Sequence, residues 1–149
     1  MTKIKRSDSD DKDFQCLVTL LDQDLKIRDG DEHSFYDQFN KVDMIKNVVV
    51  YYENNLPVAC GAFKQYDENT VEIKRMYVKN EYRGKGIGVI ILTELEAWAS
   101  ELNYTSAILE TGKKQPEAIR LYQKSGYILI PNFGQYENVE NSVCMKKIF

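Results

Sequence analysis

One segment decides the fold of this chain: Val78-Lys79-Asn80-Glu81-Tyr82-Arg83-Gly84-Lys85-Gly86-Ile87-Gly88. The apolar pattern alternates like a strand before this segment and recurs at helical spacing after it. Its glycines let the backbone turn tightly and let a ligand approach closely. The first N–H groups of the following helix lack helical partners, so with the helix dipole they form an anion site. Arg83 and Lys85 add cations at its rim, and the segment therefore predicts a phosphate-rich ligand.

Two common phosphate-binding motifs do not fit this segment. A P-loop needs Gly-Lys followed by Ser or Thr, but Gly86 follows Lys85. A dinucleotide fingerprint G-x-G-x-x-G/A fails from either possible first glycine. What remains is Arg-x-x-Gly-x-Gly, filled by Arg83, Gly86 and Gly88. This pattern resembles the coenzyme A pyrophosphate loop of the GCN5-related N-acetyltransferase (GNAT) family.

The surrounding sequence supports that resemblance. Residues 71–78 form a strand-like run, Ile87, Ile91, Leu95, Trp98 and Leu102 define one helical face, and residues 105–111 form another strand-like run. Residues 115–127 then resemble the second motif of the family, with Ala118, Tyr122 and Gly126 at matching offsets. Gln115 stands where the family has Asn, and this departure leaves its contact with the coenzyme open.

Composition limits the class of protein, its partners and its location. The chain has 149 residues with 43% hydrophobic and 29% charged content, which favours a single domain over residues 1–149. A net charge of −3 disfavours a nucleic-acid coat, and no apolar run has membrane-spanning length. The N-terminus lacks a signal-peptide pattern, so we expect a cytoplasmic location. The three cysteines, Cys16, Cys60 and Cys144, lack metal-ligand spacing; we expect no metal and three buried thiols.

The order of predicted elements is β-αα-βββ-α-β-α-ββ. Its first helix begins near Asp11, a second short helix covers residues 35–39, and Asn54 and Asn55 lie in a hairpin turn. The resemblance implies an α/β (α+β) protein with the GNAT fold. Its mixed central sheet of six to seven strands would carry helices on both faces.

The resemblance also implies a coenzyme A site. Acetyl transfer from a thioester needs donors for the carbonyl oxygen and an acid for the departing thiolate. The Val78 N–H would polarise the carbonyl, and Tyr122 would act as the general acid. The residues expected to bind acetyl-CoA, the acyl donor, are Met76, Tyr77, Val78, Arg83, Gly84, Lys85, Gly86, Ile87, Gly88, Val89 and Gln115.

The general base and the acceptor pocket are less sharply defined. Glu72 and Glu110 are the candidates, because they lie on the two strands that splay apart in this fold. Glu72 is the first choice, because members of the family often have a carboxylate on its strand. Strand alternation puts Glu72 and Lys74 on one face, opposite Arg75. The residues expected to frame the acceptor are Asp31, His33, Tyr36 and Tyr136. Carboxylates beside aromatic rings suit a cationic amine, although a solvated acidic face has the same composition.

Two functions follow from these patterns. The first is transfer of an acetyl group from acetyl-CoA to a primary amine, of a small molecule or a peptide, by direct attack in a ternary complex. The alternative is a non-catalytic coenzyme A-binding or sensor module of the same fold. We expect neither nucleic acid nor a membrane as a partner, and a homodimer is compatible with the sequence.

Overall fold

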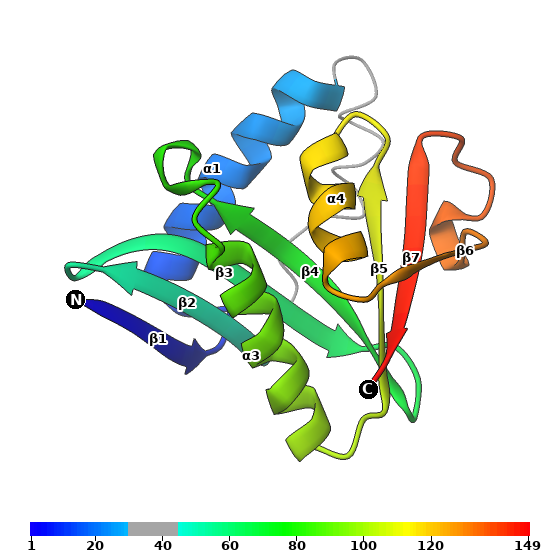
Figure 1. The fold of residues 1–149 in the computed structure, drawn as a ribbon, viewed down its shortest axis with the longest axis horizontal. Helices are drawn as coiled ribbons and strands as arrows, with labels where there is room; N and C mark the ends of the chain where they lie inside the picture. Colours follow the sequence, from blue (N-terminus) through cyan, green and yellow to red (C-terminus); the bar gives the residue numbers. More distant parts are fainter. Residues whose placement is uncertain (30–44) are drawn as a thin grey trace.

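The computed structural model describes residues 1–29 and 45–149, which form a mixed sheet with helices on both faces (Figure 1). Within these ranges the sheet has seven strands in the order β1-β2-β3-β4-β5-β7-β6. The elements are β1 (Thr2–Ser7), α1 (Lys12–Asp29), β2 (Asn47–Glu53), β3 (Leu56–Gln65), β4 (Thr70–Val78), η2 (Asn80–Tyr82), α3 (Ile87–Glu101), β5 (Ser106–Gly112), α4 (Pro116–Lys124), β6 (Ile128–Ile130), η3 (Gly134–Tyr136) and β7 (Ser142–Ile148). The predicted fold class is confirmed, while the helix expected at residues 35–39 lies outside the described residues.

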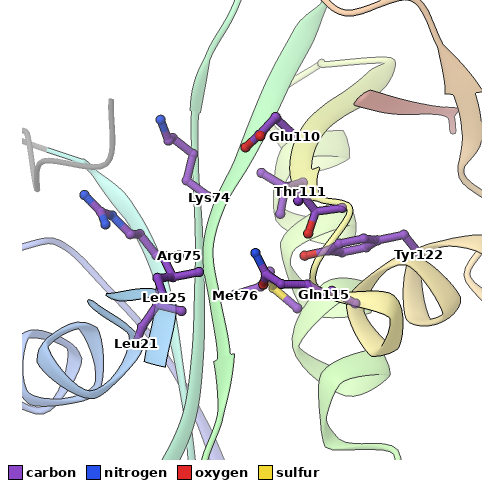
Figure 2. Close-up of a pocket in the computed structure, with 12 residues that line it drawn as sticks. Leu21, Leu25, Lys74, Arg75, Met76, Glu110, Thr111, Gln115 and Tyr122 are labelled. Carbon is purple, nitrogen blue, oxygen red and sulfur yellow. The ribbon is translucent and has the colours of Figure 1, made fainter. Parts of the chain in front are cut away.

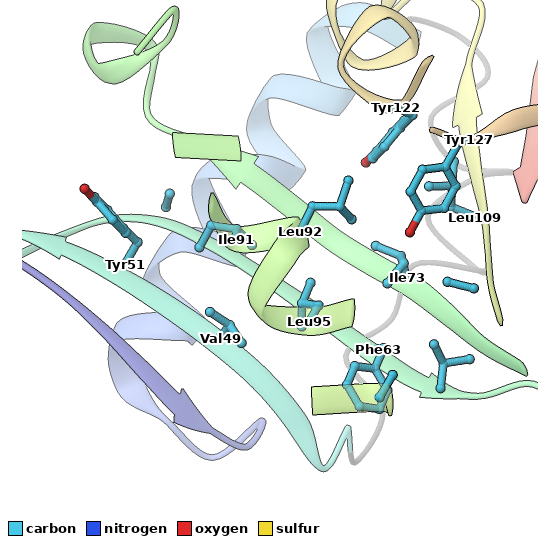
Figure 3. Close-up of a cluster of buried hydrophobic side chains, with 14 of the residues drawn as sticks. Val49, Tyr51, Phe63, Ile73, Ile91, Leu92, Leu95, Leu109, Tyr122 and Tyr127 are labelled. Atoms are coloured by element: carbon cyan, nitrogen blue, oxygen red, sulfur yellow. The ribbon is translucent and has the colours of Figure 1, made fainter. Parts of the chain in front are cut away.

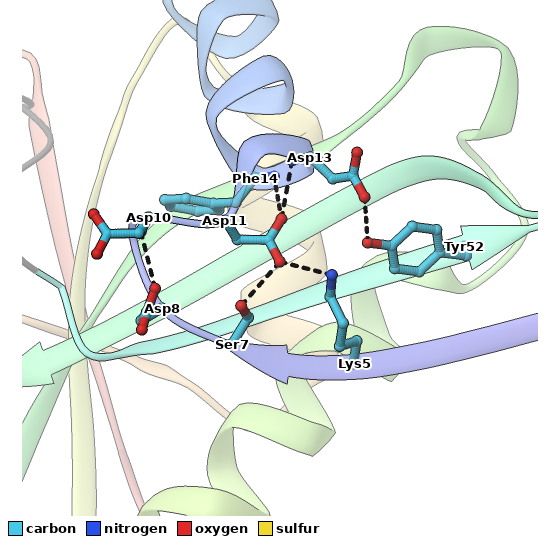
Figure 4. A network of polar contacts seen from close by, with 8 residues as sticks. All are labelled: Lys5, Ser7, Asp8, Asp10, Asp11, Asp13, Phe14 and Tyr52. Carbon is cyan, nitrogen blue, oxygen red and sulfur yellow. Dashed lines mark hydrogen bonds and ion pairs between the residues drawn. The ribbon is translucent and has the colours of Figure 1, made fainter.

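The start of α1 is fixed by Asp11, as predicted (Figure 4). Its carboxylate accepts the backbone N–H groups of Asp13 at 2.9 Å and Phe14 at 3.0 Å, which no helical carbonyl could satisfy. The same carboxylate pairs with the Lys5 ammonium at 2.6 Å and accepts the Ser7 hydroxyl at 2.9 Å. The cap therefore also ties α1 to β1.

The turn between β2 and β3 has the residues that its geometry needs. Asn54 and Asn55 have φ angles of 52° and 66°, in the left-handed region that asparagine tolerates better than most residues. The predicted hairpin is confirmed, and its two positive φ angles are those of a two-residue turn that matches the twist of the strands.

Apolar side chains pack on both faces of the sheet. The larger cluster lies under α3 and α4 and includes Val49, Phe63, Ile91, Leu95 and Leu109 (Figure 3). The smaller cluster, around Phe14, Leu17, Val48 and Val50, lies under α1. Burial of this kind is the main stabilising term in folding, and here it also fixes the helices that flank the site.

The sheet opens at its centre, between β4 and β5. These parallel strands pair only where Thr70–Glu72 face Ser106–Ile108. At the closed end the hydroxyl groups of Thr70 and Ser106 are 2.7 Å apart. Beyond Glu72 the strands separate, and the antiparallel partner of β5 on its other side is β7. The expected splay is confirmed, and beyond Glu72 it leaves β4 without a strand neighbour on the β5 side, while β3 still pairs with β4 on the other side.

One expectation about β4 is wrong. The register with β3 moves from Ala62–Lys74 to Cys60–Tyr77, so β4 has one residue more than its partner across this step. Arg75 lies in this bulge with φ 59°. The extra residue cancels the strand alternation, because a bulge re-aims the side chains that follow it. Arg75 therefore extends on the same side as Lys74, toward α1, and not on the opposite face (Figure 2).

The cysteines also differ in part from expectation. Cys60 and Cys144 are buried, as predicted, but Cys16 is exposed on α1. Its helical position places it next to the apolar stripe rather than in it, which the apolar neighbours in the sequence did not reveal. Among the residues described, no helix has the length and apolarity needed to cross a membrane.

Candidate active site

A groove of about 430 Å³ is lined by the end of β4, the glycine-rich loop with the start of α3, and residues of α4 and α1. It lies beside the glycine-rich segment for which the sequence predicted a phosphate-rich ligand. The expected coenzyme residues that line it are Met76, Tyr77, Val78, Arg83, Gly84, Gly86, Ile87, Gly88, Val89 and Gln115.

The floor of the groove is a loop whose shape depends on glycine. Gly84 and Gly86 have φ angles of 79° and 81°, which side chains with a Cβ rarely adopt. The first helical hydrogen bond of α3 runs from the Ile90 N–H to the Gly86 carbonyl at 3.2 Å. The N–H groups of the three preceding helical residues therefore have no partner within the helix. N–H groups placed in this way at a helix N-terminus could hold an anion such as a pyrophosphate.

Gly88 has a different role, because it lets two helices approach each other. A Cβ built there would lie 3.1 Å from Leu121 Cδ2 on α4. This is closer than most real Cβ contacts. The glycine-rich segment thus shapes both the loop and the packing of α3 against α4, which together form the groove walls.

The two cations of the loop are placed differently from each other. Arg83 Nε donates to the Val78 carbonyl at 2.8 Å, its guanidinium lies 3.6 Å from Asp24, and it stacks over the Tyr77 ring at 5.6 Å. Arg83 thus braces the loop against β4 and α1 while lining the groove. The Lys85 ammonium lies over the Tyr82 ring at 5.3 Å, and Lys85 is not among the residues that line the groove.

The end of β4 offers a backbone donor to the groove. Lys79 N–H donates to the Val58 carbonyl at 2.9 Å, and Val78 faces Ala59 at the preceding register position. Antiparallel pairs alternate between hydrogen-bonded and non-hydrogen-bonded positions, so the Val78 N–H points away from β3. It points to the side from which β5 has diverged.

A smaller cavity, of about 100 Å³, lies at the gap between β4 and β5 and shares Met76, Gln115, Ala118 and Tyr122 with the groove. Figure 2 shows Tyr122 and Gln115 reaching toward β4 from α4 and its N-terminus. The predicted acid, Tyr122, is 6% exposed and packs edge-on against Tyr127 with ring centroids 5.9 Å apart. Burial and the Glu110 carboxylate raise the pKa of Tyr122 above its ordinary value, so it is protonated at neutral pH.

The two candidate general bases differ in their position relative to the small cavity. Glu110 lines the small cavity together with Tyr122, and its carboxylate accepts the Ser142 hydroxyl at 2.7 Å. Glu72 is 4% exposed, does not line that cavity, and lies 3.8 Å from the Lys74 ammonium. The geometry therefore favours Glu110 over Glu72, which reverses the order expected from the sequence.

Of the expected acceptor residues, the structure describes Tyr136, which is 2% exposed. Its ring packs against Phe133 at 5.7 Å, in the loop that joins β6 to β7. Burial and the nearby carboxylates of Glu110 and Glu72 raise its pKa. Asp31, His33 and Tyr36 lie outside the described residues.

Several residues that line the groove were missed from the sequence, among them the charged residues Asp24, Glu117, Arg120 and Lys124. Asp24 comes from α1, and Arg120 and Lys124 come from α4, beside the glycine-rich loop. The spacing of four residues between Arg120 and Lys124 puts both on one helical face, and this could have identified them. Asp24 gave no comparable signal, because its position depends on how α1 crosses the sheet. Across residues 1–29 and 45–149, no group of three or more His, Cys, Asp or Glu side chains could hold a metal ion.

Comparisons with known proteins identify the family. The model of the acetyltransferase (GNAT) family matches residues 14–127. Among curated proteins, an IAA acetyltransferase of Azospirillum brasilense is 36% identical over 91 residues, which is 60% of each chain. This chain therefore covers less than two thirds of that relative.

Solved structures agree with this assignment. A proposed acyl-CoA N-acyltransferase from Klebsiella pneumoniae has a TM-score of 0.82 and 27% identity, covering 99% of this chain and 97% of that one. The PaiA N-acetyltransferase from Thermoplasma acidophilum, solved with coenzyme A, has a TM-score of 0.74. At 16% identity, over 100% and 99% of the two chains, it shows the shared fold. The protein has the fold of the GNAT acetyltransferases, and it belongs to the GNAT family.

Proposed function

We propose that this protein transfers an acetyl group from acetyl-CoA to the primary amine of a small molecule. One observation carries the proposal: the groove floored by the glycine-rich loop adjoins the cavity lined by Tyr122 and Glu110, and the two share lining residues, Tyr122 among them. A phosphate-binding end is thereby joined to a pair of proton-transfer groups at the gap in the sheet. This is the arrangement that acyl transfer from a coenzyme thioester needs.

The groove residues fit the donor. The free N–H groups at the start of α3 would hold the pyrophosphate, and Arg120 and Lys124 would add positive charge along α4. Acetyl-CoA supplies the thioester. The Val78 N–H would donate to the carbonyl oxygen of the acetyl group as negative charge develops there, which is often a large catalytic effect.

Two proton transfers complete the reaction. The amine reaches the site as an ammonium and must lose a proton before it attacks. Glu110 would take this proton directly or through a water molecule. Tyr122 would give its proton to the sulfur as the carbon–sulfur bond breaks, and its raised pKa keeps that proton available at neutral pH.

Direct attack is favoured over an acetyl-cysteine intermediate. Cys144 is buried, and burial raises the pKa of its thiol to about 11. Cys60 is fully buried, and burial raises its pKa further. A thiol nucleophile reacts as the thiolate, so neither group suits the role. A ternary complex of protein, acetyl-CoA and amine avoids this requirement.

The alternative is a coenzyme A-binding module without catalysis. The substitution Tyr122→Phe distinguishes this hypothesis from the enzyme. We expect kcat to fall by roughly 100-fold or more, since a positioned acid contributes about 10²–10⁴-fold. The dissociation constant of acetyl-CoA should stay unchanged. Thiol release and calorimetry measure these two quantities.

Tyr127→Phe is a matched control for that substitution. Tyr127 is also a buried tyrosine, but its hydroxyl donates to Glu96 at 2.9 Å and it lines neither cavity. Its loss should lower stability and leave kcat near the wild-type value. A sensor would show acetyl-CoA binding without turnover in all three proteins. The cytoplasmic location and the homodimer stay predictions.

A further inference from the structure

Ser142, at the start of β7, contacts the candidate base Glu110 through a short hydrogen bond. The Ser142 hydroxyl oxygen lies 2.7 Å from Glu110 Oε2. An ionised carboxylate only accepts hydrogen bonds, so the hydroxyl is the donor. The distance is typical of a bond from a hydroxyl to a charged oxygen, which is stronger than a bond between neutral groups.

The strand register explains why these two residues meet. β5 and β7 are antiparallel, with Glu110 opposite Cys144 and Gly112 opposite Ser142. Glu110 and Ser142 therefore lie on one face of the sheet as diagonal neighbours, which a long side chain can span. Gly112 has no side chain that could compete for the hydroxyl. The contact thus follows from the pairing of two strands that are distant in the sequence.

The splay of the sheet makes β7 the strand that can orient this carboxylate. β5 pairs with β4 only as far as Ile108, two residues before Glu110. At Glu110 the β4 side of β5 borders the small cavity, which Glu110 lines. On its other side β5 stays paired with β7 through Gly112. The strand that remains beside Glu110 is therefore the one that carries Ser142.

Ser142 is itself held in a fixed position. The residue is 4% exposed. Its backbone N–H donates to the Val139 carbonyl at 3.1 Å. The Lys113 N–H donates at 2.9 Å to the carbonyl of Asn141, the preceding residue. The start of β7 is thus tied to its own loop and to the loop between β5 and α4, so the hydroxyl is a rigid donor.

We propose that Ser142 is a positioning residue for acetyl transfer, whose hydroxyl fixes one oxygen of Glu110 and keeps the carboxylate ionised and oriented for the acceptor amine. The inference rests on the proposed acetyltransferase function, in which Glu110 takes the amine proton. A donor to the charged form of a carboxyl group favours that form. Glu110 has other interactions in the fold, and the Ser142 hydroxyl adds to them.

Other titratable groups also surround Glu110. They lie on four elements and are Glu72, Lys74 and Arg75 on β4, Tyr122 on α4, Tyr136 on η3 and Cys144 on β7. Burial raises the pKa of both tyrosines and raises that of Cys144 to about 11, so these three are neutral at and below pH 7. Burial lowers the pKa of Lys74, and the carboxylates of Glu72 and Glu110 oppose this. An effect of pH must therefore be assigned to Glu110 by variants.

The first experiment measures thiol release from acetyl-CoA against pH, with the amine that the wild-type protein acetylates fastest. In Ser142→Ala we expect kcat at pH 7 to fall about 10-fold. The midpoint of the acidic limb of kcat/KM should rise by about one pH unit, as the loss of a hydrogen bond to a charged group implies. Ser142→Thr keeps the hydroxyl and should restore both quantities. Ser142→Cys keeps a similar size with a weak donor, and its midpoint should also rise.

Ser106→Ala is the matched control. Ser106 is a serine of β5 that is 5% exposed, and its hydroxyl lies 2.7 Å from that of Thr70 at the closed end of the sheet. It does not line the small cavity. Its loss should lower the free energy of unfolding and leave the midpoint unchanged.

A carboxyl ¹³C NMR titration gives a readout that does not depend on turnover. The Glu110 signal is assigned by its absence in Glu110→Gln. Its titration midpoint should be higher in Ser142→Ala than in the wild type and unchanged in Ser106→Ala. In the kinetic profile, Glu110→Gln should lose the acidic limb.

The outcomes separate this inference from the proposed function. A higher midpoint in Ser142→Ala by both methods, restored in Ser142→Thr, supports the role of Ser142. A lower kcat with an unchanged midpoint, or an equal change in Ser106→Ala, would overturn that role and leave acetyl transfer standing. No thiol release with any amine would overturn the proposed function, and the positioning role in acetyl transfer with it. The NMR titration would then still show whether Ser142 favours the ionised form of Glu110.

Discussion

Gly61 on β3 supports the whole groove by letting α3 lie close to the sheet. A Cβ built at this position would lie 2.6 Å from Met76 Sδ, 2.7 Å from Ile91 Cγ2 and 2.9 Å from Leu95 Cδ1. Real Cβ atoms essentially never approach so closely. Ile91 and Leu95 are fully buried in the core under α3, and Met76 lines both cavities.

Gly61→Ala should therefore destabilise the protein. Overpacking a filled core costs about 1–3 kcal/mol. Replacing glycine by alanine also restricts the unfolded chain, which by itself would raise the free energy of unfolding by about 0.4–1 kcal/mol. The net loss should be about 1–2 kcal/mol in the free energy of unfolding. Acetyl-CoA should also bind more weakly, because α3 carries the loop that would hold its pyrophosphate.

Urea unfolding measures the first effect and calorimetry with acetyl-CoA the second. Gly112→Ala is the control for stability, because a Cβ at this strand glycine would meet its nearest atom at 3.4 Å, on the flexible Gln115 side chain. It should keep or slightly raise the free energy of unfolding. If Gly61→Ala were as stable as the wild type, α3 would not be held against β3 as described, and the reasoning would fail.

Three further predictions follow from single contacts. Glu110→Gln should lower kcat by roughly 10²-fold or more, and by more than Glu72→Gln, in steady-state assays with any accepted amine; equal losses would remove the preference for Glu110. Burial acts to raise the pKa of Asp11, but hydrogen bonds, led by the one from Lys5, outweigh it and lower that pKa. The carboxylate therefore stabilises the fold above its unfolded pKa of about 3.9 and loses this effect as the pH falls through the lower folded value. Asp11→Asn keeps a capping oxygen, so it should be about 1 kcal/mol less stable than the wild type at pH 7, with the difference shrinking in urea titrations as the pH falls below about 3.9; a constant difference would contradict this. Cys16 is exposed and the other two thiols are buried, so a thiol reagent should label one cysteine rapidly in the native protein, and rapid labelling of Cys60 would contradict the described packing.

Local patterns in the sequence predicted much of the fold. The cap at Asp11, the turn at Asn54 and Asn55 and the start of α3 depend on residues close together in the chain. Their physical causes, which are capping, positive φ and apolar periodicity, can be read without tertiary contacts. The loop that lines the groove was predicted for the same reason.

The parts that sequence reasoning missed depend on neighbouring strands. The bulge at Arg75 is defined by how β4 pairs with β3, and no residue pattern within β4 predicts it. The ranking of Glu110 above Glu72 depends on where β5 leaves β4. The need for glycine at position 61 arises from α3, which packs across β3. Each is a relation between distant segments.

The measurement that tests acetyl transfer most directly is thiol release from acetyl-CoA across a panel of amines, with the acetylated product identified by mass spectrometry. The wild-type protein should release thiol with at least one class of amine and form the matching N-acetyl product, and Tyr122→Phe should lose most of this turnover. Acetyl-CoA binding without release or product for any amine in the panel would contradict the catalytic account and favour the coenzyme A-binding module.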